Sequence, residues 1–267
     1  MSTRSPCRRR YGCRELLGRF ASGGGALYDL EYLVNDAGRR VAAFGYWAGY
    51  AGAAVSLKCW AAQGRGGLCP PISTYTSASA LVADIRADLD AAIARPSVII
   101  IGALGRVGTG ARELCAALGV QTTDWDMAET ASGGPFPQVL AHDVFLNCIL
   151  ASPGCPVFVP ASAKAATRKL SVIGDIACDP TSEFSPVKVY DRTTTWDAPA
   201  LRVHDTPPLD VTAIDNLPSL LPLESSLDFA KQLLPWLGTL DKLDAGVWGR
   251  AKATFDQHLD LIQRGAT

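Results

Sequence analysis

Three glycines and one aspartate have types and a spacing that indicate a chemical function. In the segment 97–110, SVIIIGALGRVGTG, Gly102, Gly105 and Gly108 follow an apolar run at intervals of three residues. Glycine lets a ligand approach the backbone closely, and the amino terminus of a helix attracts negative charge. This spacing between a strand and a helix therefore predicts a turn that binds the pyrophosphate of a dinucleotide. The alternative is that the glycines only form a tight corner between the strand and the helix.

Asp126 indicates which dinucleotide would bind. It ends the strand-like run 121–126, about 20 residues after the glycines, where a carboxylate accepts hydrogen bonds from both hydroxyls of an adenosine ribose. Because the same carboxylate repels a 2′-phosphate, the sequence predicts NAD rather than NADP. Two other nucleotide-binding classes are excluded. No tyrosine is followed four residues later by lysine, as a short-chain dehydrogenase requires, and no Gly-Lys-Ser/Thr follows the glycines, as a P-loop requires.

The elements that must position these residues alternate between strands and helices. Residues 98–101 are all aliphatic, which is typical of a parallel strand covered on both faces, and a helical run ends at Gly119. Further strand-like runs cover 121–126, 142–150 and 168–177. This alternation predicts an α/β fold with a doubly wound, Rossmann-like parallel sheet.

Other segments also have clear local patterns. An amphipathic helix is expected over 79–95, with Leu81, Ile85, Leu89 and Ile93 on one face. The uncharged segment 41–57 favours a buried, tightly packed helix; its three glycines dilute the hydrophobicity that the alternative, a membrane span, would need. The sequence NDAG at 35–38 predicts a turn between two strand-like runs.

Composition narrows the class of partner. The 25 basic and 26 acidic side chains nearly balance, so the chain has no overall field for a polyanion, and a small molecule is expected rather than nucleic acid or a membrane. The eight cysteines form no C-x-x-C pair and have no histidine at ligand spacing, which argues against a metal site. No secretory signal is recognised, so reduced thiols in an intracellular compartment are expected.

Longer motifs resemble one enzyme family. They are GALYDLEYLVNDAGRRVAAFGYWAGYAGAA, IIGALGRVGTGA, DWDMAETASGGPF, FLNCI, AIDNLPSLLPLESS and VWGRAKATFDQHL. In this order, from about Gly18 to about Leu261, they resemble saccharopine dehydrogenase, the NAD-dependent, lysine-forming enzyme of the fungal aminoadipate route of lysine biosynthesis. The resemblance implies an oxidoreductase that converts saccharopine, NAD and water to L-lysine, 2-oxoglutarate and NADH.

The resemblance also implies the site residues. Cofactor contacts are implied for Arg39, Gly105, Arg106, Asp126, Thr130, Ile176, Ile214, Asp215, Asn216 and Leu217. Substrate contacts are implied for Arg40, Phe44, Ala177, Cys178 and Asp179. Arginine suits a substrate with three carboxylates, because a guanidinium group binds a carboxylate through two parallel hydrogen bonds. Without the resemblance, a solvated turn would be the favoured interpretation of Arg39 and Arg40.

Two departures from the family pattern qualify these implications. Leu150 stands where the family often has a tyrosine that contacts the cofactor. The family's proton-transferring lysine and histidine lie upstream of the segment matched by residues 16–20, and this chain has no lysine before Lys58 and no histidine before His142. We therefore expect an amino-terminally truncated member whose catalytic groups are unassigned. The alternative is a catalytically impaired NAD-binding fragment or pseudoenzyme.

The resemblance predicts a domain organisation as well. We expect a remnant of the first, substrate-binding domain in 1–43, the NAD-binding domain in 44–217, and helices in 218–267 that return to the first domain, so that both chain ends build a partial second α/β domain. Apolar surface there, such as Trp236 and Trp248, is expected to promote self-association. A cytoplasmic location is expected, with peroxisomal and mitochondrial locations as alternatives, since residues 1–24 are basic.

Overall fold

The protein divides into two compact units. The computed structural model describes residues 12–264, so the basic stretch 1–11 lies outside the described residues. The central unit is Phe44–Ser225, and the other unit joins the two chain ends, up to Ala43 and from Ser226. The division falls after Ser225 rather than at the expected 217/218 boundary, because Leu220 and Leu221 are buried in the core of the central unit.

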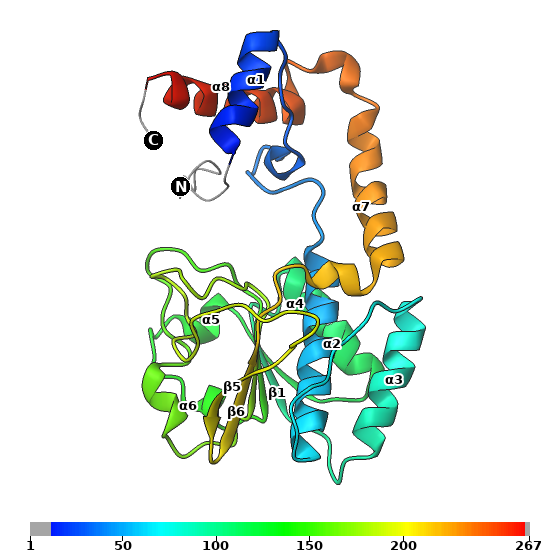
Figure 1. The fold of residues 1–267 in the computed structure, drawn as a ribbon, viewed down its shortest axis with the longest axis vertical. Coiled ribbons are helices and arrows are strands. Elements are labelled where there is room, and N and C mark those ends of the chain that lie inside the picture. The colour runs from blue at the N-terminus through cyan, green and yellow to red at the C-terminus, as the bar shows by residue number, and fades with distance from the viewer. Residues whose placement is uncertain (1–11, 265–267) are drawn as a thin grey trace. The chain divides into compact units, whose positions relative to one another are not determined.

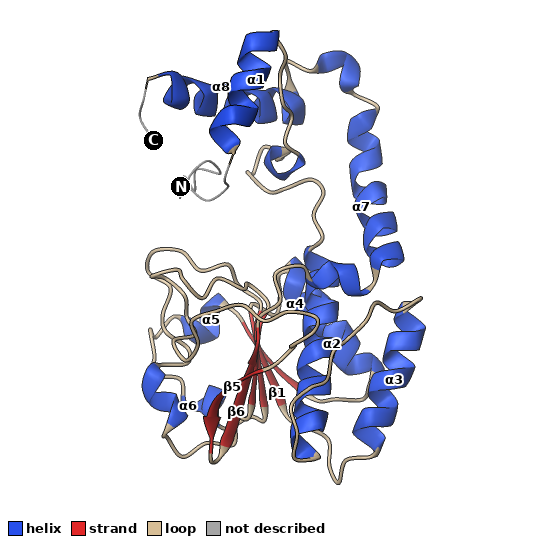
Figure 2. Ribbon diagram, viewed as in Figure 1, coloured by secondary structure: helices blue, strands red, loops and turns tan. Residues whose placement is uncertain are grey.

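A six-stranded sheet forms the middle layer of the central unit (Figure 2). Its strands are β1 (Val98–Ile101), β2 (Thr122–Trp125), β3 (Val144–Asn147), β4 (Val172–Asp175), β5 (Leu201–Asp205) and β6 (Pro208–Thr212). They lie in the order β2-β1-β3-β4-β6-β5, and all are parallel except β5, which pairs antiparallel with β6. The predicted doubly wound parallel sheet is confirmed. The antiparallel β5–β6 pair is not among the strands predicted from the sequence.

Both faces of the sheet are covered (Figure 1). Helices α2 (Gly45–Gly64), α3 (Ala78–Asp90) and α4 (Arg106–Ala117) lie on one face, and the short helices α5 (Met127–Thr130) and α6 (Pro137–Leu140) lie on the other. The side chains of β1 divide between the two cores: Val98 and Ile100 join the α2 side, and Ile99 the opposite side. This is why the strand is aliphatic at every position.

Helices α2 and α4 pack with their backbones in contact. A Cβ atom on Gly49 would lie 1.8 Å from the carbonyl oxygen of Val107, and one on Gly110 would lie 1.9 Å from the carbonyl oxygen of Tyr46. The uncharged segment is thus a tightly packed buried helix, as predicted. No helix within residues 12–264 is long and apolar enough to cross a membrane.

Helix α3 ends earlier than its apolar periodicity predicts. Leu81, Ile85 and Leu89 are buried, but α3 ends at Asp90 and Ile93 is fully exposed, so the prediction for Ile93 is wrong. The helix is also fixed to α2 by charge, since the Lys58 ammonium lies 2.7 and 2.8 Å from carboxylate oxygens of Asp84 and Asp88.

The second unit is helical in its described part. It contains α1 (Cys13–Gly23), α8 (Gly246–Gln263) and most of α7 (Pro222–Leu237). The turn at 35–38 is present, but the strands expected around it reduce to a single β-bridge between Val34 and Arg40. A small core gathers Leu33, Val247, Trp248 and Ala251.

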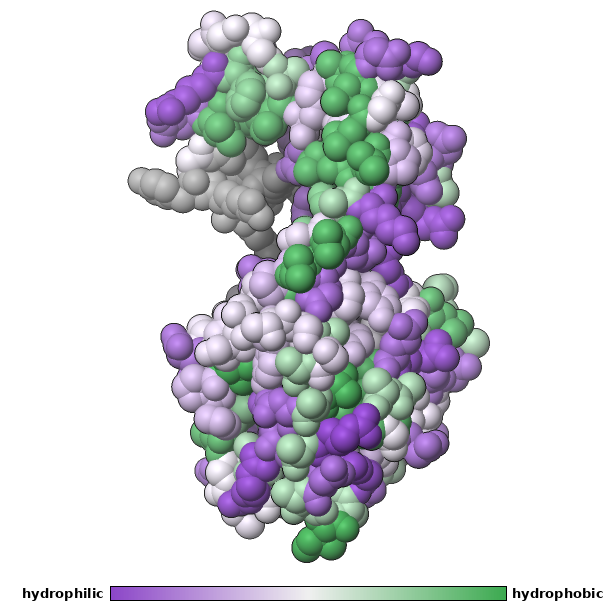
Figure 3. Space-filling model, turned by 90° about the vertical axis from the view of Figure 1, so that its right-hand side faces the viewer, coloured by the Kyte–Doolittle hydropathy of each residue, from purple (hydrophilic) through white to green (hydrophobic). Residues whose placement is uncertain are grey.

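The expected exposure of Trp248 is wrong. Its side chain is only 4% exposed, and its indole N–H donates to the carbonyl oxygen of Trp236 and to the hydroxyl of Thr239, at 3.1 and 3.0 Å. Leucines of α7 instead supply apolar surface, with Leu227 and Leu234 62% and 67% exposed; green surface of this kind is visible in Figure 3. The expected self-association stays a prediction.

Candidate functional site

The strand order creates one natural place for a ligand. Strand β1 lies between β2 and β3, and all three are parallel. The chain leaves β1 through α4 toward β2 on one side and later enters β3 on the other side. Such a reversal leaves a crevice outside the carboxyl ends of the strands, where α/β folds bind their ligands. Gly102, Asp126 and Cys148 directly follow β1, β2 and β3 and therefore meet at this edge.

The three glycines have three different roles. Gly102 has a φ of +87°, which favours glycine, and a Cβ atom there would lie 2.5 Å from Ile149 Cγ2. A Cβ atom on Gly108 would lie 2.2 Å from the carbonyl oxygen of Gly102, so α4 packs directly on the turn. Gly105 has ordinary angles (φ −74°, ψ 172°), and the nearest atom to its Cβ position is the Gly102 oxygen at 3.4 Å.

Gly105 therefore distinguishes a ligand-binding turn from a plain corner. Either kind of turn would need Gly102 and Gly108, because protein atoms already crowd both positions. Nothing in the described protein requires glycine at 105, whereas a pyrophosphate that approaches the first turn of α4 would require bare backbone there. The geometry favours the phosphate-binding turn.

The carboxylate of Asp126 lies against this turn. Its Oδ2 accepts a hydrogen bond from the backbone N–H of Leu104 at 3.0 Å, and its Oδ1 accepts one from the N–H of Met127 at 2.9 Å. Thr130 donates its hydroxyl hydrogen to the carbonyl oxygen of Asp126 at 3.0 Å and so closes α5 onto the same residue. In the capping box of α5 the carboxylate also accepts from the backbone N–H of Glu129. An ionised carboxylate offers about four acceptor positions, so about one remains for a ribose hydroxyl. These residues fit the adenosine end of NAD.

Exposed apolar side chains stand at the same edge. Leu104, Met127 and Leu150 follow β1, β2 and β3, and they are 74%, 83% and 68% exposed. Such side chains offer apolar surface to the flat rings of a dinucleotide. At Leu150 any contact can only be apolar, because a leucine side chain carries no hydrogen-bonding group.

A buried acid begins the turn that follows β4. Asp175 is 1% exposed; it accepts hydrogen bonds from Asn147 Nδ2 at 2.9 Å and from the Tyr190 hydroxyl at 2.7 Å. Burial raises the pKa of Asp175, while the hydrogen bonds from Tyr190, Asn147 and the backbone amides that follow lower it; the net shift is upward. The acid and its partners lie within the crevice-forming edge of the sheet.

Cys178 occupies the same turn, in surroundings that favour its neutral thiol. Burial raises the pKa of its thiol to about 12, and the negative charges of Asp215, Asp175 and Asp179 act in the same direction. The thiol donates to the carbonyl oxygen of Ala213 at 3.1 Å. Only the thiolate is reactive, so a neutral, hydrogen-bonded Cys178 has a structural role in the turn.

The segment after β6 is divided between core and surface. Ile214 and Leu217 are 3% exposed and belong to the core under α2, so their side chains have little surface for a cofactor. Asp215 and Asn216, between them, are exposed. Ile176 lies against α2, because a Cβ atom on Gly52 would lie 2.5 Å from its Cγ1 atom.

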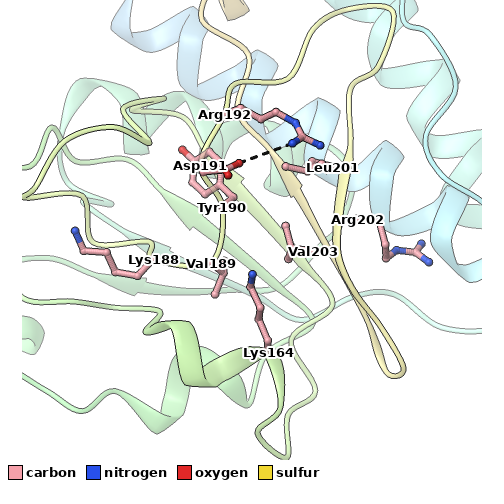
Figure 4. Close-up of a pocket in the computed structure, with 9 residues that line it drawn as sticks. All are labelled: Lys164, Lys188, Val189, Tyr190, Asp191, Arg192, Leu201, Arg202 and Val203. Atoms are coloured by element: carbon pink, nitrogen blue, oxygen red, sulfur yellow. Dashed lines mark ion pairs between the residues drawn. The ribbon is translucent and has the colours of Figure 1, made fainter.

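A separate surface hollow of about 370 Å³ lies beside β5, away from the glycine turn. Its lining includes Lys164, Lys188, Arg192 and Arg202, but their charged ends diverge (Figure 4). The Arg202 guanidinium is already held by the carboxylate of Asp210, with one contact of 3.1 Å. The hollow therefore lacks the convergent polar groups of a binding site.

Comparison with known proteins decides the family. No protein-family model matches the chain. It is 46% identical over 262 residues to a saccharopine dehydrogenase (NAD⁺, L-lysine-forming) of Yarrowia lipolytica, across 93% of this chain and 71% of the relative. Proteins of the same name from Neurospora crassa and Candida albicans are 44% and 41% identical, across 96% and 95% of this chain and 72% of each relative. This chain belongs to the saccharopine dehydrogenase family.

A solved structure supports the fold of this saccharopine dehydrogenase family member. An L-alanine dehydrogenase superposes with a TM-score of 0.61 at 17% identity, over 96% of this chain and 73% of the other. At that identity the likeness concerns the fold alone.

The remaining site residues of this saccharopine dehydrogenase family member lie in two units. Arg39 and Arg40 belong to the unit of the chain ends, where Arg40 pairs with Glu31 at 3.0 Å and both arginines are exposed. Phe44 and Arg106 belong to the central unit. Phe44 directly precedes α2, and the Arg106 side chain lies 3.5 Å from the Cβ position of Gly45, at the start of α2.

Sequence reasoning missed Asn147, Asp175 and Tyr190 in this saccharopine dehydrogenase family member. A signal for two of them exists: Asn147 and Asp175 each end an otherwise apolar strand, where a polar side chain is unexpected unless it serves the carboxyl edge. Tyr190 lies in a segment without regular structure, so no local pattern marks it.

Proposed function

We propose that this chain is an NAD-dependent oxidoreductase acting on a CH–NH bond, which cleaves saccharopine with NAD and water to L-lysine, 2-oxoglutarate and NADH. The observation that carries the proposal is the identity of 41–46%, over 93–96% of the chain, to saccharopine dehydrogenases of the NAD⁺-dependent, L-lysine-forming type. The glycine turn and the adjacent carboxylate of Asp126 support the choice of NAD, since they fit a pyrophosphate and an unmodified ribose.

The residues of this chain would bind different parts of the cofactor and the substrate. Bound NAD supplies the acceptor for the hydride that leaves the carbon next to the secondary amine. Gly105 opens the start of α4 to the pyrophosphate, and Asp126 binds the ribose. Arg40 binds a substrate carboxylate through its guanidinium group. Asp179 and Asp215 place negative charge next to the turn after β4, which favours a cationic amine over an anionic group there.

The proposal is tested by mixing the purified chain with saccharopine and NAD and following NADH absorbance, with NADP as the comparison. NADH formation with NAD, accompanied by release of lysine and 2-oxoglutarate in equal amounts, is the expected result. If NADH binds in a fluorescence titration but no turnover is seen, the result supports the nucleotide site and contradicts the proposed activity. If neither NADH binding nor turnover is seen, the whole proposal is contradicted.

A further inference from the structure

Asn147, Asp175 and Tyr190 form a buried polar cluster that no step above uses. Asn147 and Asp175 are register partners at the ends of β3 and β4, and they are 0% and 1% exposed. Tyr190 is 8% exposed and packs in the core on the α6 side of the sheet. A carboxylate in this position is unfavourable unless its oxygens are hydrogen-bonded, and both are: Oδ1 accepts from Asn147 and Oδ2 from Tyr190.

The cluster sits inside the turn that Asp175 begins. The N–H of Cys178 donates to the carbonyl oxygen of Asp175 at 3.2 Å, which makes 175–178 a closed turn. Cys178 has a φ of +51°, in the left-handed region that disfavours a non-glycine residue. The backbone amides of Ala177 and Cys178 also face the Asp175 carboxylate and help to keep it charged. These hydrogen bonds to the carboxylate help to offset the cost of the left-handed backbone at Cys178.

The neighbouring cofactor position is held in a different way. The side chain of Ile176 packs on α2 at Gly52, and its backbone N–H donates to the carbonyl oxygen of Asn147 at 3.1 Å, so neither contact involves the Asp175 carboxylate. Loss of a hydrogen bond to Asp175 should therefore loosen residues 177–179 more than Ile176, and more than the glycine turn after β1. This difference separates an effect on the substrate from an effect on the cofactor.

We propose that Asp175, held by Asn147 and Tyr190, is a positioning residue that sets residues 177–179 for the amine-bearing substrate saccharopine. The inference rests on the proposed function, because residues 177–179 are substrate contacts only if saccharopine and 2-oxoglutarate bind at this site. Asp175 itself is buried and acts through the turn. Tyr190 acts through Asp175.

The variant Tyr190→Phe tests this inference, because it removes one hydroxyl and keeps the aromatic ring. Tyr75→Phe is the matched control: the Tyr75 hydroxyl also donates to a carboxylate, at 2.5 Å from Asp84 Oδ2, but on the side of α2 and α3. Three quantities are measured on the full chain: NADH affinity by fluorescence, saccharopine affinity of the NADH-saturated protein by calorimetry, and amide hydrogen exchange of residues 177–179.

Tyr190→Phe should weaken saccharopine binding by about three- to tenfold, the range for loss of one buried hydrogen bond, while NADH affinity stays within about twofold. Exchange of the amides of residues 177–179 should become faster in the same variant. Tyr75→Phe should change none of the three. Asp175→Asn, which keeps the shape and removes the charge, should move the same two quantities in the same direction.

Three results would overturn the positioning role, and the first two are unchanged exchange in Tyr190→Phe and faster exchange with unchanged saccharopine affinity. The third is an equal loss of NADH and saccharopine affinity, because it would indicate a general structural effect. A parent chain that binds NADH but neither 2-oxoglutarate nor saccharopine would contradict the proposed function instead, and the exchange measurement would still show whether the cluster sets the turn.

Discussion

Replacing Gly105 with alanine tests the nucleotide site most directly. The added methyl group would meet no protein atom closer than 3.4 Å, and the backbone angles at Gly105 are accessible to alanine. Two small effects on stability oppose each other. A compatible Gly→Ala change stabilises by about 0.4–1 kcal/mol, and alanine is a poorer helix N-cap than glycine by a similar amount. The free energy of unfolding should therefore change by less than about 1 kcal/mol.

The effect of Gly105→Ala on the cofactor should be much larger. The methyl group would stand between a pyrophosphate and the first turn of α4, and would weaken at least one charged hydrogen bond to the backbone. Such a bond contributes about 1.5–3 kcal/mol, which corresponds to a loss of NADH affinity of about 10- to 100-fold. Fluorescence titration with NADH measures the affinity, and urea denaturation measures the stability of the same samples.

Gly108→Ala is the matched control for this experiment. Its methyl group would lie 2.2 Å from the carbonyl oxygen of Gly102 and 2.5 Å from Ala103 Cα, so the backbone itself must move. Overpacking of this kind costs about 1–3 kcal/mol or more, and a lower free energy of unfolding is expected even without ligand. If Gly105→Ala bound NADH as tightly as the parent, the pyrophosphate would not lie on this turn and the reasoning would be refuted.

Three further changes probe other parts of the protein. Asp126→Ser should reduce the preference for NADH over NADPH in calorimetry. An unchanged ratio of the two affinities would show that Asp126 does not bind the ribose. Arg40→Ala should weaken 2-oxoglutarate binding to the NADH-saturated protein with little effect on NADH; equal affinity would return Arg40 to the role of a solvated side chain. Asp143→Asn should lower the free energy of unfolding by about 1–2 kcal/mol at pH 7, because the carboxylate accepts hydrogen bonds from Ser97 and Lys169. Burial raises the pKa of Asp143, but these bonds outweigh burial and lower it overall, so the stabilisation is present above the unfolded pKa of about 3.9 and is lost as the pH falls below it. Denaturation at pH 7 and pH 3 should therefore show a smaller difference between variant and parent at pH 3.

The parts of the fold that the sequence predicts are those with local causes. Strand β1 is recognisable because it is aliphatic at every position, and the glycine turn because its spacing follows directly on that strand. Asp126 is found because its distance from the glycines is set by one helix and one strand. Each of these signals lies within a few residues of the structure it predicts.

Other features depend on contacts between distant segments and leave no local pattern. The apolar spacing of α3 continues to Ile93, but nothing packs on that position, so the helix ends before it. Trp248 is buried because Tyr28 and Trp236, from both chain ends, pack around it. The bond between Tyr190 and Asp175 joins residues from two segments, and neither segment predicts the other.

Two aspartates with similar sequence neighbourhoods have different roles because the sheet is parallel. Asp143 precedes β3, and with Ser97 and Lys169 it joins the segments that enter β1, β3 and β4 at the amino edge. Asp175 ends β4, at the carboxyl edge, where the strand order predicts that a ligand binds. Since all amino ends of parallel strands lie on one side, loss of Asp143 should affect stability and leave the ligand site intact, whereas loss of Asp175 should affect the turn that faces the ligand. Once a strand is recognised in the sequence, the end at which an aspartate lies is known. That end therefore predicts whether substitution of the aspartate changes the stability or the ligand site.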